Sequence, residues 1–182
     1  MHSKRLAGVA LIAATWMGYS SMAQADVTVW STNAAACVPM SASGLVVTAG
    51  AVTAGSGNTL TLYCGVTKHP GGFAYIEITY KGGGPLVVTG EALSTQQAQL
   101  VNPLFSGVAT SQLIEMSRQT GVETVKCGVQ SKGSVQIATE RNICNNSNLD
   151  FEKNFYYLRI NLRSGLLAGQ DFTVYGSSLV SR

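Results

Sequence analysis

Residues 155–162 read FYYLRINL and form the clearest strand pattern in the chain. The even-numbered positions all carry Tyr, Leu or Ile, whereas the odd-numbered positions carry Phe155, Tyr157, Arg159 and Asn161. Successive side chains of an extended chain point to opposite faces, so one face of this segment is apolar and the other is aromatic and polar. The pattern predicts a strand that buries one face in a core and turns the other to solvent.

Shorter strand patterns surround this segment and are separated by turns rich in Gly, Ser and Asn. They cover residues 26–31, 45–49, 59–66, 73–80, 86–89, 113–117, 122–129, 134–139, 171–175 and 178–180. We expect residues 122–129 and 134–139 to form a hairpin, and residues 91–100 have the helix formers of a short surface helix. Many short strands without a long amphipathic helix predict an all-β fold, an antiparallel β-sandwich of jelly-roll type.

The first 25 residues have the layout of a secretory signal peptide. Lys4 and Arg5 give a positive start, twelve apolar residues follow, and an A-x-A cleavage site ends at Ala25. Twelve residues span about 18 Å as a helix, too short for a hydrocarbon core of about 30 Å. The pattern therefore predicts cleavage after Ala25, a single mature domain over residues 26–182 and export to the periplasm or the extracellular space.

Charge is low throughout the chain, with 12 Lys+Arg, 9 Asp+Glu and 12% charged residues in 182. Removal of Lys4 and Arg5 with the leader lowers the net charge from +3 to +1. This balance argues against a nucleic-acid partner, which a basic patch would attract. A second long apolar stretch is missing after the leader, so we expect no transmembrane anchor.

Four cysteines follow the leader, and an even number in an exported chain predicts disulfides. They are Cys37, Cys64, Cys127 and Cys144. The sequence permits three connectivities, of which the local one, Cys37 with Cys64 and Cys127 with Cys144, is favoured. A zinc site is disfavoured because no Cys-x-x-Cys occurs and one histidine remains after the leader.

Catalytic patterns are weak in this sequence. His69, the histidine that remains after the leader, lies in a Gly- and Pro-containing turn, and no G-x-S-x-G motif surrounds a serine. Any β-sandwich can bring two carboxylates together, and Glu77 between two isoleucines is interpreted as a solvent-facing strand position. We predict no catalytic residue, no cofactor and no enzymatic activity.

Residues 146–152 alternate oxygen-bearing side chains, the ligand type that calcium prefers. This segment has two carboxylates and lacks the glycine of an EF-hand loop, so it is interpreted as a polar turn beside Cys144. We therefore predict no metal site.

Exposed aromatic side chains are the best candidates for a binding surface, because the face of the ring packs against an apolar part of a ligand while its polar group remains hydrated. Trp30 and Tyr157 are the two candidate surface-binding residues. Tyr63, Phe73, Tyr75 and Phe155 are further aromatic candidates, and at least half of the six belong in the core.

The residues resemble a loose group of small exported bacterial β-sandwich proteins that has no known activity. The resemblance rests on short motifs: Cys37-Val38-Pro39, LTLYCGV at 60–66, Asp150-Phe151, the segment 155–163 and GSSL at 176–179. It implies a fold and no binding residue. A second resemblance, to pilin subunits that polymerise by donor-strand exchange, implies that residues 26–36 act as an extension with Val27 and Val29 as insertions.

These features favour an exported, non-enzymatic structural or interaction protein of the cell envelope or the extracellular space. We expect self-association as one possibility, because uncharged strand surfaces covered with Ser and Thr can pack against other copies of the same chain. The alternatives are a lectin-like carbohydrate-binding module with a surface glycan as partner and a pilin-like subunit.

Overall fold

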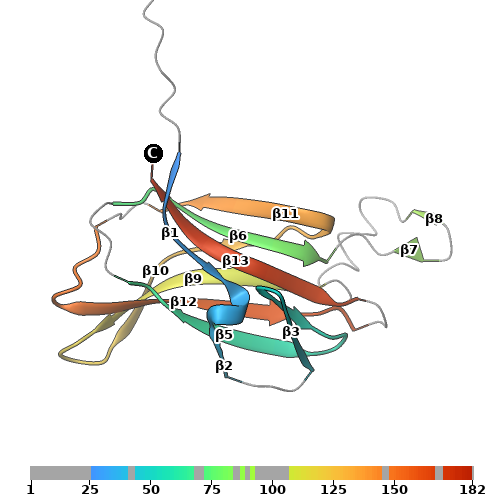
Figure 1. Ribbon diagram of the computed structural model, residues 1–182, viewed down its shortest axis with the longest axis horizontal. Coiled ribbons are helices and arrows are strands. Elements are labelled where there is room, and N and C mark those ends of the chain that lie inside the picture. The colour runs from blue at the N-terminus through green and yellow to red at the C-terminus, as the bar shows by residue number, and fades with distance from the viewer. Residues whose placement is uncertain are drawn as a thin grey trace, which may run out of the picture.

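The computed structural model describes residues 26–40, 44–67, 72–83, 87–88, 91–92, 107–144, 148–166 and 170–181. These residues form an antiparallel β-sandwich, in which two sheets lie face to face across one core (Figure 1). The predicted all-β sandwich is therefore confirmed. The predicted signal peptide, residues 1–25, lies outside the described residues.

One sheet is built around the C-terminal strand and is called the β13 sheet below. Strand β13 pairs on one edge with β6, which pairs with β11. Its other edge is shared, because β1 pairs with residues 176–181 and β4, itself paired with β3, pairs with residues 172–174. The strands are β1 (Val27–Asn33), β3 (Leu45–Thr48), β4 (Ala51–Ala54), β6 (Tyr75–Gly82), β11 (Ser134–Ile143) and β13 (Phe172–Ser181).

The other sheet is built around the strand that the sequence predicts most clearly and is called the β12 sheet. Strand β12 pairs with β9 along its whole length and with β5 on its other edge, so it is central. β10 and β2 form the two outer positions. The strands are β2 (Val38–Pro39), β5 (Thr59–Gly65), β9 (Val108–Ser117), β10 (Glu123–Gln130) and β12 (Asn154–Arg163).

Three small elements complete the described chain. A 3-10 turn, η1 (Ala34–Ala36), joins β1 to β2, and the side chain of Asn33 caps it by accepting from the Ala36 amide at 2.9 Å. Strands β7 (Val87–Val88) and β8 (Glu91–Ala92) pair with one another. The expected helix at residues 91–100 is therefore wrong at its start, and its remaining residues lie outside the described ones.

The core forms where the inward faces of the two sheets meet. Leu158, Ile160 and Leu162 of β12 are fully buried, as the alternation of residues 155–162 predicts. On the opposite side of the core, Tyr80 on β6 and Phe172 on β13 both belong to the β13 sheet, and their rings stack with centroids 5.6 Å apart. Burial of an aliphatic side chain stabilises a fold by about 1.5–3 kcal/mol, so this central strand contributes strongly.

A pair of serines crosses the apolar core. Ser111 of β9 and Ser177 of β13 are both buried, and their hydroxyl oxygens are 2.9 Å apart. Ser177 donates to the backbone carbonyl of Glu77, so Ser111 supplies the hydrogen between the two hydroxyls. Two buried hydroxyls thus satisfy one another and join the two sheets through a hydrogen bond.

Both disulfides have the predicted local connectivity. Cys37 is bonded to Cys64, which ties the segment after η1 to β5. Cys127 is bonded to Cys144, which ties β10 of one sheet to the residue after β11 of the other. The second bond therefore crosslinks the two layers of the sandwich.

The hairpin predicted for residues 122–129 and 134–139 is wrong. Both segments are strands, but β10 pairs with β9 and β11 pairs with β6, so they lie in different sheets. Ser131 lies in the segment that runs from β10 in one sheet to β11 in the other, and it is buried. Its hydroxyl accepts from the Ala109 amide at 2.9 Å, and its own amide donates to the Ala109 carbonyl. A local turn pattern is the same for a hairpin and for a crossing between sheets. The strand predicted at residues 113–117 is confirmed and extends over all of β9.

The N-terminal segment is part of this domain's own sheet. Val27 lies opposite Ser181 in the antiparallel pairing of β1 with β13, so the start of β1 and the end of the chain lie side by side (Figure 1). The pilin-like hypothesis would place residues 26–36 in a neighbouring subunit. In this structure β1 is paired within its own chain instead.

Candidate functional site

The outward face of the β12 sheet presents an aromatic and polar surface around Tyr157. Tyr157 lies opposite Gly65 of β5, and Arg159 lies opposite Tyr63 of the same strand. On the other side, Arg159 lies opposite Gln112 of β9. Residues opposite one another in a sheet project to the same face, so these side chains form one continuous surface.

The aromatic part of this surface is a pair of tyrosines. The ring centroids of Tyr63 and Tyr157 are 5.6 Å apart and the rings are tilted by 48°. Phe155 precedes them on the same face of β12 with 46% of its surface exposed, and the guanidinium of Arg118 lies 4.0 Å above its ring. Aromatic rings at this spacing offer several apolar faces to one ligand.

Gly65 leaves space beside the two rings. A Cβ atom built at Gly65 would meet no atom within 4 Å, and the residue is exposed. Tyr157 therefore has no side chain opposite it on β5, and its ring is open to solvent on that side.

The polar part of the surface continues along β12 from the aromatic part. The Arg159 guanidinium donates from Nη2 to the amide oxygen of Gln112 at 3.0 Å. Further along, the Thr61 hydroxyl donates to the amide oxygen of Asn161 at 2.9 Å. Amide and guanidinium groups can donate several hydrogen bonds each, so this part can bind a ligand rich in oxygen.

Tyr157 is held in its neutral form. Its hydroxyl donates to a carboxylate oxygen of Glu123 on β10. Burial, together with the hydrogen bond to the Glu123 carboxylate, raises the pKa of Tyr157 to about 12. The ring therefore presents an uncharged phenol at physiological pH, with its position fixed by Glu123.

We call this surface the tyrosine platform, defined by Tyr63, Gly65, Gln112, Tyr157, Arg159 and Asn161. Sequence alternation places Tyr157, Arg159 and Asn161 on one face of a strand, and the structure agrees. The contributions of Gly65 and Gln112 could not be predicted, since they depend on the register of β5 and β9 against β12.

Trp30, the other residue predicted for surface binding, lies elsewhere. It is on β1 of the β13 sheet, opposite Leu179, and is partly buried against the core. The structure therefore does not bring Trp30 and Tyr157 together.

Two open hollows lie on the outward face of the β13 sheet. One has a volume of about 410 Å³ and includes Thr53, Lys81 and Thr173 in its lining. The other has a volume of about 640 Å³ and includes Ser31, Thr32, Asn33, Thr79 and Ser178. Both share Tyr175, so the two hollows place one aromatic side chain among hydroxyl groups and are a second place where a ligand could lie.

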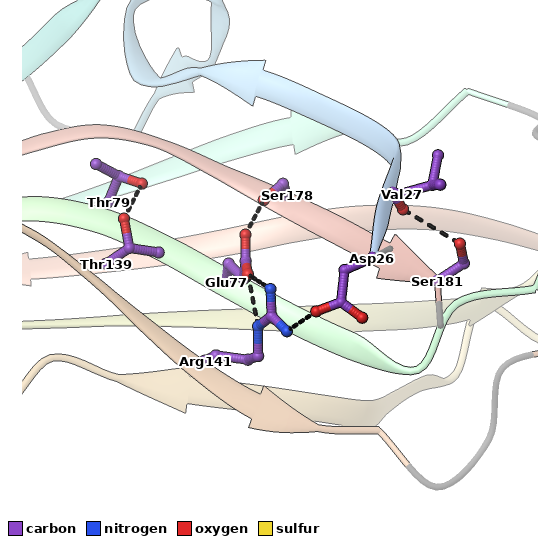
Figure 2. A network of polar contacts seen from close by, with 8 residues as sticks. All are labelled: Asp26, Val27, Glu77, Thr79, Thr139, Arg141, Ser178 and Ser181. Carbon is purple, nitrogen blue, oxygen red and sulfur yellow. Dashed lines mark hydrogen bonds and ion pairs between the residues drawn. The ribbon is translucent and has the colours of Figure 1, made fainter. Parts of the chain in front are cut away.

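Glu77 belongs to a polar network on the β13 sheet (Figure 2). Its carboxylate accepts from Arg141 Nε at 2.7 Å and from the Ser178 hydroxyl at 3.0 Å. Arg141 also pairs with Asp26 and lies 4.7 Å above the ring of Tyr75. The network joins β6, β11 and β13 to the residue before β1, and its charges satisfy one another, which indicates a structural role.

The predicted polar turn at residues 146–152 is described in part, and Asn146 lies outside the described residues, as does His69. Asp150 accepts hydrogen bonds from the backbone amides of Glu152 and Lys153 at 3.1 and 3.2 Å. These backbone donors lower the pKa of Asp150. Within the described ranges, no group of three His, Cys, Asp or Glu residues is placed to hold a metal ion.

The part of the chain that the structure describes contains no helix long and apolar enough to span a membrane.

Comparison with known proteins found distant similarity to solved structures and no similarity in sequence to a known family or curated protein. No protein-family model and no curated protein matches the chain. Among solved structures, the xylan-binding module CBM15 is similar with a TM-score of 0.44 at 12% identity, over 86% of this chain and 96% of that chain. TmCBM61 in complex with β-1,4-galactotriose has a TM-score of 0.39 at 11% identity, over 81% of this chain and 83% of that chain.

Proposed function

We propose that this chain is an exported, non-catalytic module that binds carbohydrate on the tyrosine platform. The observation that carries the proposal is the open tyrosine pair, Tyr63 and Tyr157, beside the amide and guanidinium groups of Gln112, Asn161 and Arg159. A sugar ring has an apolar face and a rim of hydroxyl groups. The platform offers a matching surface for each of these two features.

Stacking on the two tyrosines supplies the apolar part of the proposed interaction. An aromatic side chain carries large apolar area with few rotatable bonds, so little conformational entropy is lost when a ligand covers it. The hydroxyl of Tyr157 is already bonded to Glu123, which leaves the ring face as its available binding surface.

The polar part supplies orientation. Gln112, Arg159 and Asn161 are positioned by the paired strands β9 and β12. Side chains on paired strands keep their spacing better than side chains on loops, so their donors are arranged before a ligand arrives. The platform runs along one face of the β12 sheet, which suits a chain-like ligand lying along the strands.

The experiment is a glycan array followed by affinity electrophoresis of the purified protein in gels that contain the polysaccharides found on the array. Gly65→Val is the most informative variant, because its Cβ would meet no atom within 4 Å and its methyl groups would fill the space beside Tyr157. We expect Gly65→Val and Tyr157→Ala to abolish retardation in the gel while the circular dichroism spectrum stays unchanged.

Tyr175→Ala is the matched control, because Tyr175 is an aromatic residue on the outward face of the other sheet. Retardation should persist in this variant. Loss in Tyr175→Ala with retention in Tyr157→Ala would move the site to the β13 sheet, and no binding to any glycan would overturn the proposal.

A second candidate function is self-association through the edges of the β13 sheet. Val46 and Val47 on β3 are 54% and 55% exposed, and Val135 and Ile137 on β11 are 69% and 61% exposed. Both are outer strands of the described sheet, and an exposed apolar edge strand favours pairing with another chain. Sedimentation over a range of protein concentrations tests this candidate, and a monomer at every concentration would contradict it.

A further inference from the structure

The cation of the tyrosine platform differs from several others on the described surface. Three of those are closely paired: Lys126 with Glu115 at 3.5 Å, Lys132 with Glu140 at 3.1 Å and Arg141 with both Glu77 and Asp26. Arg159 on the platform has a weaker counter-charge, since its Nη1 is 3.9 Å from the nearer carboxylate oxygen of Glu123.

Glu123 is already committed to another donor. One of its carboxylate oxygens accepts the hydroxyl hydrogen of Tyr157, and the other is the oxygen that lies near Arg159. The pKa of Tyr157 is raised to about 12, so this phenol stays a donor over the whole physiological range. Glu123 therefore positions Tyr157 and neutralises Arg159 incompletely.

Arg159 itself has donor capacity left. One nitrogen donates to Gln112, but Nε is buried and has no hydrogen-bond partner among the described residues. Its side chain is 30% exposed, so the outer part of the guanidinium reaches the surface. A planar guanidinium favours a carboxylate, which accepts two parallel hydrogen bonds.

The arginine also lies at the right place relative to the rings. Tyr157 and Arg159 are two residues apart on β12, which is about 7 Å along a strand. A sugar ring on Tyr157 that carries a carboxylate on its edge would direct that group to Arg159. Arg118, whose guanidinium covers Phe155, adds a second positive charge on the aromatic side.

We infer that the ligand of the platform is an acidic polysaccharide, a polymer of uronic acid units, with Arg159 as the group that binds the carboxylate. This inference rests on the proposed carbohydrate function and specifies its ligand class. Because the attraction is between surface charges, binding weakens as salt rises.

The test compares two probes that differ in their carboxylates alone: polygalacturonate and the same polymer after chemical reduction of its carboxylates to alcohols. Affinities are measured by isothermal titration calorimetry at low and at physiological salt. We expect the acidic polymer to bind at least tenfold more tightly at low salt and the difference to shrink as salt increases.

Variants at Arg159 give the second arm. Arg159→Gln should lower affinity for polygalacturonate about tenfold more than it lowers affinity for the reduced polymer, and Arg159→Lys should keep the salt dependence with part of the affinity. Arg141→Gln on the other sheet is the matched control and should bind both polymers as the native protein does.

The outcomes separate the two proposals. Equal affinity of the native protein for the two polymers overturns the acidic-ligand inference and leaves the carbohydrate-binding proposal intact. Tighter binding of the reduced polymer also overturns it. Binding of neither polymer, with no binding on the glycan array, overturns both.

Discussion

Tyr63 on β5 and Tyr157 on β12 hold their ring centroids 5.6 Å apart, although the two residues come from distant parts of the chain. They lie diagonally across a strand pair, since Tyr63 is opposite Arg159 and Tyr157 is opposite Gly65. Such a contact contributes to stability as well as to the proposed binding surface.

The first prediction concerns the energy of this ring pair. Tyr63→Ala and Tyr157→Ala should each lower the free energy of unfolding, and the double variant should cost less than the sum of the two. We expect a coupling of about 0.5–1.5 kcal/mol from a double-mutant cycle measured by urea unfolding. Strict additivity would show that the rings contribute independently.

The second prediction concerns alkaline pH. Below pH about 10, the Tyr157 phenol is protonated in both the folded and the unfolded chain, so it adds no pH dependence. Between pH about 10 and the folded pKa of about 12, the unfolded chain has lost this proton while the folded chain keeps it. Unfolding is therefore favoured as pH rises, and stability falls through this window.

Tyr157→Phe removes this contribution, so its urea midpoint should fall less steeply in the same window than that of the native protein. Tyrosinate absorbance of the folded protein should also lose a late titration step in the variant. Loss of a step near pH about 10 in its place would show that Tyr157 ionises like an exposed tyrosine.

The third prediction concerns two strand glycines with opposite surroundings. A Cβ at Gly176 would lie 2.3 Å from the backbone oxygen of Thr32, whereas a Cβ at Gly65 would meet nothing within 4 Å. Gly176→Ala should therefore displace β1 from β13 and destabilise the fold by about 1–3 kcal/mol, as overpacking does. Gly65→Ala is the matched control and should change the thermal midpoint little; equal effects would contradict the close approach of β1.

The fourth prediction concerns the buried serine pair. Ser111→Ala leaves Ser177 with its bond to the Glu77 carbonyl. Ser177→Ala removes the acceptor of the Ser111 hydroxyl and leaves Ser111 buried without a partner. Ser177→Ala should therefore cost about 1–3 kcal/mol, and Ser111→Ala less. The double variant should be no less stable than Ser177→Ala, which chemical denaturation can measure.

The fifth prediction concerns the crosslink between the sheets. Replacing Cys127 and Cys144 together by Ala should lower stability by about 3 kcal/mol, because the bond closes a loop with a sequence separation of 17. The comparison is the pair Cys37 and Cys64, with a separation of 27 and an expected cost of about 3.5 kcal/mol. Native stability under strong reductant would contradict both values.

Local geometry made much of the platform predictable. Alternation along residues 155–162 places Tyr157, Arg159 and Asn161 on one face and buries Leu158 and Ile160, because side chains of any extended segment alternate. The disulfide pairing was favoured by the short separations between Cys37 and Cys64 and between Cys127 and Cys144, and the structure confirms it.

Pairing between strands was not predictable in the same way. Residues 122–129 and 134–139 suggested a hairpin, but their partners are β9 and β6, and Ser131 in the segment between them is bonded to Ala109 at the start of β9. The partner of Glu77 was not predictable either. Glu77 pairs with Arg141, which also pairs with Asp26, and the three residues come from separate parts of the chain.

The sequence by itself therefore determined which faces of the strands are apolar and that the chain is all-β, and it favoured the local cysteine pairing. The tertiary structure decided that Tyr63 lies beside Tyr157, that Gly65 leaves space next to them and that Gln112 lies opposite Arg159. The physical reason is that alternation follows from the backbone of one segment, whereas register follows from the packing of the whole core.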